Sequence, residues 1–127
     1  MYTELIFGAE LKQDTPIEVI NTLKYMVGEI EEPINLLYKE DRNPLMSGSY
    51  YFGVNKAVTK MFYDDISEAW VLSSRANIKN YNSEIEKFLE WIKPFIESGS
   101  GLREMYAIVI YEEEETPTIY YLYDNES

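Results

Sequence analysis

The residues best suited to acid–base chemistry in this sequence are the carboxylates Asp64, Asp65 and Glu68, which lie within one expected turn. Hydrolases that use two carboxylates need them to face each other across a cleft, and the side chains of one tight turn seldom do. Tyrosine hydroxyls have weak acid–base capacity, and the sequence offers no nucleophile with a positioned base. The sequence therefore predicts a protein that is not an enzyme.

The residue types that are missing narrow the chemistry further. The 127-residue chain contains no cysteine and no histidine, which excludes disulfides, thiol nucleophiles, serine–histidine triads and metal centres built on thiolate or imidazole. The run Glu112–Glu115 lacks the spaced pattern of a calcium loop. The segment 98–101, Ser-Gly-Ser-Gly, follows an expected helix and lacks the ending of a phosphate-binding P-loop. We expect no metal and no cofactor.

Charge restricts the partners. The chain has 11 basic and 23 acidic side chains, a net charge of −12, which opposes binding to duplex nucleic acid or to an anionic membrane. Four cations, Lys56, Lys60, Arg75 and Lys79, lie in the near-neutral middle of the chain. Two interpretations stay open: a surface that mimics a polyanion, in which Glu112–Glu115 would take part, or a few cations gathered at one site. No apolar run reaches about 18 residues, so we expect a cytoplasmic protein.

Periodicity predicts the elements that must position these residues. Alternating apolar residues indicate strands, and apolar residues three or four positions apart indicate helices. The expected strands cover 2–11, 49–54, 57–63, 68–75, 105–111 and 118–123. A first helix is expected from a capping box at Thr15 and Pro16 to a stop at Gly28, and a second from Asn80 or Asn82 to about 96, with its last turn bent by Pro94.

Between the first helix and the second expected strand, residues 29–48 are predicted to form a long loop with one helical turn around 34–38. The resulting order is β-α-β-β-β-α-β-β in one domain over 1–127. It predicts an α+β fold: a mostly antiparallel sheet of five or six strands with the two helices on one face.

An α+β sandwich of this kind leaves one face of the sheet without helices, and the candidate site lies there. Strand alternation predicts that Tyr51, Lys60, Phe62 and Arg75 share this face. Aromatic rings suit base stacking and cations suit phosphate, so Tyr51 and Phe62 are candidate stacking surfaces. Arg75 and Lys79 are candidate phosphate ligands, with Lys60 in support. The same face would also suit a second copy or a partner protein, or it would simply be solvated.

Several segments add a resemblance. Residues 49–55, 75–81, 88–94 and 117–122, together with the opening ELIFGAELKQDTP, resemble a group of small bacteriophage and prophage proteins without an assigned activity. The resemblance implies a viral gene, a bacterial cytoplasm and a role against host defence. The function expected first is binding without chemistry that sequesters a nucleotide-derived immune signal. The alternatives are an acidic inhibitor of a host defence protein, such as a DNA mimic or an anti-CRISPR-like protein, and a virion or assembly protein. A homo-oligomer is expected in each case.

Overall fold

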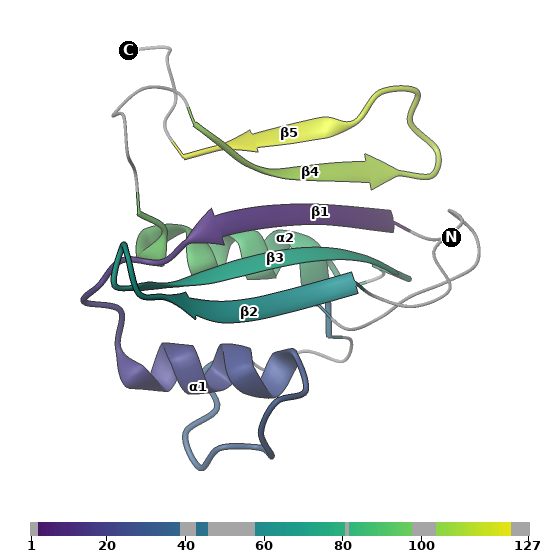
Figure 1. Cartoon of the computed structure of the whole chain (residues 1–127). Helices are drawn as coiled ribbons and strands as arrows, with labels where there is room; N and C mark the ends of the chain where they lie inside the picture. Colours follow the sequence, from purple (N-terminus) through teal and green to yellow (C-terminus); the bar gives the residue numbers. More distant parts are fainter. Residues whose placement is uncertain (1–2, 39–42, 46–57, 81, 98–103, 123–127) are drawn as a thin grey trace.

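The computed structural model describes residues 3–38, 43–45, 58–80, 82–97 and 104–122. In this part of the chain five strands form one antiparallel sheet, accompanied by two α-helices and one 3-10 turn (Figure 1). The strands are β1 (Thr3–Glu10), β2 (Val58–Asp64), β3 (Ala69–Ile78), β4 (Met105–Tyr111) and β5 (Thr118–Tyr121). The helices are α1 (Ile17–Met26), α2 (Glu84–Ile92) and η1 (Lys93–Phe95). The predicted α+β class is confirmed, with five strands.

The N-terminal strand β1 lies in the middle of the sheet. The spatial order is β2-β3-β1-β4-β5, and Figure 1 shows β1 between β3 and β4. The register places Phe7 opposite both Ser74 of β3 and Ala107 of β4. Residues directly opposite each other in an antiparallel pair point to the same side of the sheet. The two faces can therefore be traced across all five strands from this register.

Both helices pack on the same face. The ring of Phe88 in α2 lies 5.5 Å from that of Phe7 in β1, and the Nζ atom of Lys24 in α1 lies 4.5 Å from the ring centre of Trp70 in β3. Trp70 points to the same side as Ser74, and therefore as Phe7, because side chains alternate along a strand and Ser74 is opposite Phe7. The prediction that the helices share one face is confirmed.

The hydrophobic core lies between this face and the helices. The residues that form it follow the spacing found in the sequence: every second position in β1, and every third or fourth in the helices. Its fully buried members include Leu5, Leu23, Leu72, Ile85, Phe88, Leu89, Ile92 and Val109. Burial of each such side chain stabilises the fold by about 1.5–3 kcal/mol.

The ends of the helices depart from the predictions in two places. The capping box is wrong: the hydroxyl of Thr15 donates to the carbonyl of Lys12 at 2.6 Å, and Pro16 precedes the first turn without a side-chain cap. The helical turn expected at 34–38 does not form. There Tyr38 is buried and donates to the carbonyl of Glu84, because packing on α2 outweighs a weak local helix preference. Gly28, with φ 86° after α1, and the 3-10 turn at Pro94 are as predicted.

The strand boundaries also differ. The strand expected at 49–54 lies outside the described residues. β3 ends at Ile78, three residues beyond the predicted end, because Ala76 and Ile78 pair with Leu5 and Thr3 of the central strand. Residues 76–78 are expected to form a loop from their local residue types, but β1 supplies a partner strand, so they extend β3.

Candidate functional site

The face of the sheet opposite the helices carries three of the predicted site residues. Lys60 is paired with Ser73, and Phe62 with Val71, on the side away from Thr59 and Ser74, whose hydroxyls bond each other on the helix side at 2.8 Å. We call this surface the open face. Its described members include Glu4, Ile6, Gly8, Glu10, Lys60, Phe62, Val71, Ser73, Arg75, Asn77, Ile108, Ile110 and Ile119. At one end of the face Glu4 and Asn77 are buried, whereas Lys60, Phe62, Ser73 and Arg75 are exposed. Tyr51 lies outside the described residues.

Lys79 lies one residue beyond β3, which ends at Ile78, and is exposed. Arg75 lies within the strand, three residues before its end. Of these two cations only Lys79 therefore lies in the segment between β3 and α2. At that helix end the side chain of Asn80 accepts from the backbone N–H of Ile85 at 2.9 Å and donates to Glu86 at 2.7 Å. The N-cap residue of α2 is Ser83, in the left-handed conformation and without a side-chain cap bond, so neither Asn80 nor Asn82 occupies the predicted cap position. Asn80 nevertheless satisfies the Ile85 N–H from a position three residues before Ser83, and an anion at this helix end would compete with it.

Arg75 has a partner within the chain. Its guanidinium donates to the carboxylate of Glu4 in an ion pair. The Arg75 side chain is 51% exposed, whereas that of Glu4 is 2% exposed. The carboxylate neutralises Arg75 before any ligand arrives. Glu4 precedes Arg75 by 71 positions, so only the pairing of β1 with β3 reveals the contact.

An aliphatic row crosses the open face and was not recognised in the sequence. Ile6 of β1 is directly opposite Ile108 of β4, which is directly opposite Ile119 of β5. On the other side Ile6 is opposite Arg75. Ile119 is 41% exposed and Phe62, at the far edge, 44% exposed. The sequences of β1 and β4 could have indicated the row, because consecutive apolar residues in each strand place apolar side chains on both faces of the sheet.

Gly8 lacks a side chain and leaves a depression on the open face. It lies opposite Ser73 of β3, and a Cβ built on Gly8 would meet no atom within 4 Å. The backbone of β1 is therefore directly accessible between Ser73 and the aliphatic row. Such a depression lets a partner side chain approach the sheet closely.

Two tyrosines on the helix side of the sheet, Tyr106 and Tyr111, have raised hydroxyl pKa values. Burial, together with neighbouring Tyr120, raises the pKa of Tyr106 to about 12. Burial and a hydrogen bond to Glu86 raise the pKa of Tyr111 as well. Both hydroxyls are protonated at neutral pH, so these tyrosines contribute packing and hydrogen bonds and do not serve as bases.

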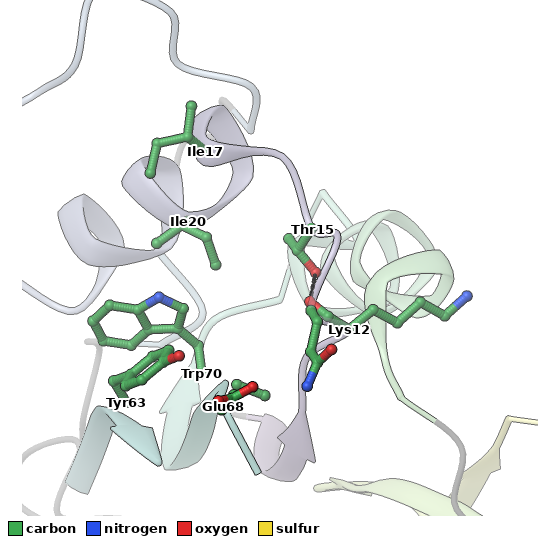
Figure 2. A pocket seen from close by; sticks show the side chains of 9 residues that line it. Lys12, Thr15, Ile17, Ile20, Tyr63, Glu68 and Trp70 are labelled. Carbon is green, nitrogen blue, oxygen red and sulfur yellow. Dashed lines mark hydrogen bonds between the residues drawn. The ribbon is translucent and has the colours of Figure 1, made fainter. Parts of the chain in front are cut away.

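A cleft opens at the other side of the molecule, between the start of α1 and the β2–β3 turn. It has a volume of about 190 Å³. Figure 2 shows Ile17 and Ile20 of α1 above Trp70 and Tyr63, with Glu68 at the lower right of Trp70. The remaining lining residues are Lys12, Gln13, Thr15 and Ala69. In the adjoining turn Asp64 accepts from the backbone N–H of Ile66 at 3.0 Å, as an ordinary turn-forming residue does.

Comparison with protein-family models, with curated proteins and with solved structures finds no significant match. Within the described ranges no three carboxylates converge as the ligands of a metal would. Neither helix of the described part has the length and hydrophobicity needed to cross a membrane. The site must therefore be interpreted from its own geometry.

Proposed function

We propose that this chain is a non-enzymatic binding protein that recognises another protein through the open face. The observation that carries the proposal is the row Ile6–Ile108–Ile119, which crosses three strands on a face that neither helix covers. Protein interfaces combine an apolar centre with aromatic and arginine side chains. Here the Arg75–Glu4 pair flanks the row, and Phe62 lies farther along the same face on the edge strand β2, opposite Val71.

Charge supports a protein partner over a nucleic acid. The net charge of −12 repels phosphate backbones, and Glu4 already compensates Arg75. The acidic turn Glu112–Glu115 joins β4 to β5, the two strands that supply Ile108 and Ile119. A basic partner would be steered toward this edge. In the setting that the phage resemblance implies, the partner is a host defence protein in the bacterial cytoplasm, blocked by this acidic surface.

Sequestration of a nucleotide-derived immune signal is the second candidate. It is supported by Lys60 and Phe62, which lie two residues apart on the open face of β2 and are both exposed. A cation beside an exposed ring suits a phosphate and a base. In this candidate Lys60 supplies the first phosphate contact, since binding through Arg75 would first have to separate it from Glu4.

Site-specific photocrosslinking tests the protein-binding proposal. Phe62 is replaced by p-benzoylphenylalanine, which keeps an aromatic ring on the open face, and the variant is irradiated in bacterial cells. The matched control carries the same group at Ile34, which is fully exposed in the segment after α1. We expect a defined adduct from position 62 and none from position 34. Equal or absent crosslinking at the two positions would contradict the proposal.

The mass of the adduct separates the alternatives. An adduct of twice 14.9 kDa identifies a second copy of this chain, and light scattering then shows whether it is a dimer or a larger virion-like assembly. A heavier unique adduct identifies a partner protein. Calorimetry with a panel of cyclic nucleotides tests the second candidate: it predicts heat that Lys60→Ala and Phe62→Ala both abolish.

A further inference from the structure

The cleft beside α1 lies on the side of the sheet away from the open face, and nothing in the proposed function uses it. We propose that this cleft binds a lysine or arginine side chain presented by a partner protein. Its walls suit the aliphatic stem of such a side chain: Ile17, which is 62% exposed, lies on one side and Tyr63 and Trp70 on the other. Its polar end carries the carboxylate of Glu68.

Glu68 has an unusual backbone for its residue type. Its φ of 57° places it in the left-handed region, which glycine or asparagine adopts at lower cost. Figure 2 shows its side chain at the floor of the cleft, next to Trp70. Glycine would adopt this backbone at lower cost, which makes Glu68→Gly a variant that removes the carboxylate without straining the turn.

Lys12, the cation among the residues that line the cleft, does not neutralise that carboxylate. Figure 2 shows the side chain of Lys12 extending away from Glu68, out of the cleft. The backbone of Lys12 is fixed by its N–H, which donates to the carbonyl of Phe95 at 2.8 Å. In the described part of the chain no cation forms an ion pair with Glu68, and the net charge of −12 attracts basic segments.

The aromatic wall favours the same ligand. Tyr63 and Trp70 are in edge contact, with ring centres 5.6 Å apart, and the Nζ atom of Lys24 already lies 4.5 Å from the Trp70 ring centre on the side of α1. The second aromatic residue, Tyr63, is exposed toward the cleft mouth. A cation that enters beside Tyr63 gains both a ring and the Glu68 carboxylate.

Fluorine NMR of the whole chain tests this site. The protein has two tryptophans, so labelling with 5-fluorotryptophan gives one reporter in the cleft, Trp70, and one internal reference, Trp91, which packs on Tyr38 and Phe95. The probes are the blocked amino acids Nα-acetyl-lysine, Nα-acetyl-arginine and Nα-acetyl-norleucine N-methylamide. Norleucine has the same stem as lysine without the ammonium group.

We expect the lysine and arginine probes to shift the Trp70 signal saturably and to leave Trp91 unchanged. The norleucine probe should bind about tenfold more weakly, as expected for loss of a charge-assisted hydrogen bond. Glu68→Gln should reduce the lysine probe to the norleucine level. Glu68→Gly should do the same while the melting temperature stays equal or rises, which separates binding from folding. Asp65→Asn, on an exposed carboxylate of the same turn, is the matched control.

Three results would overturn the proposal. The first is an unchanged Trp70 signal with both charged probes. The second is equal binding of the norleucine and lysine probes, which would show a purely apolar cleft. The third is full lysine binding by Glu68→Gln. None of these results bears on the open face, so the two proposals fail independently.

Discussion

The guanidinium of Arg75 on β3 forms an ion pair with the carboxylate of Glu4 on β1, whose side chain is 2% exposed. A buried carboxylate needs a cation or several donors to offset its desolvation. Arg75 therefore stabilises the fold by pairing with a buried carboxylate, in addition to any contact it makes on the open face.

Replacement of Arg75 by alanine should destabilise the fold. Glu4 would keep its burial and lose its cation, so we expect the free energy of unfolding to fall by about 1–3 kcal/mol, which allows for the half-exposed arginine. Urea denaturation followed by tryptophan fluorescence measures the change. Lys60→Ala, an exposed cation on the same face, should change the stability by less than about 0.5 kcal/mol.

The double variant Glu4→Gln/Arg75→Ala completes a mutant cycle. Because glutamine carries no charge, this variant should recover part of the stability lost by Arg75→Ala. Equal losses in the single and double variants would show that Arg75 acts through packing rather than through Glu4.

Asn77 lies opposite Glu4 and is 1% exposed. Neither polar atom of its side chain has a hydrogen-bond partner in the structure. Asn77→Leu, which keeps the shape and removes the unpaired atoms, should raise the free energy of unfolding by about 1 kcal/mol. Asn77→Asp should lower it by about 2 kcal/mol or more, because it buries a second carboxylate beside Glu4. Destabilisation by both variants would argue that the amide is needed.

Alkaline pH should weaken the fold through Tyr106. In the unfolded chain this hydroxyl ionises near pH 10.0, and in the folded protein at about 12. Between these values the folded state holds a proton that the unfolded state has released, so stability falls as the pH rises. Denaturation midpoints measured from pH 9 to 12 should decline less in Tyr106→Phe than in the parent. Parallel declines would assign the effect to other groups.

The start of α2 gives a further test. Asn80→Ala removes both the acceptor for the Ile85 N–H and the donor to Glu86, so we expect a loss of about 1–2 kcal/mol. Thermal unfolding followed by circular dichroism measures it. Glu90→Ala, on the exposed side of the same helix, is the control and should leave the transition nearly unchanged.

Local periodicity was sufficient to predict most of the elements. The alternation in β1, the aliphatic spacing of α1 and α2, and the bend at Pro94 are properties of short segments, and each segment folds as its pattern predicts. Where the predictions were wrong, a distant partner decided the outcome: β3 is extended by its pairing with β1, and Tyr38 is buried against α2.

By itself the sequence determined the α+β class, the side of β2 on which Lys60 and Phe62 lie, and the lack of cysteine and histidine chemistry, because strand alternation and composition need no knowledge of neighbours. Only the tertiary structure decided that β1 is central. That one placement brings Glu4 against Arg75 and aligns Ile6 with Ile108 and Ile119. The tertiary structure also decided that Glu68 lies in the same cleft as Ile17. Strand order and helix docking are set by the summed burial of the whole core rather than by any one segment.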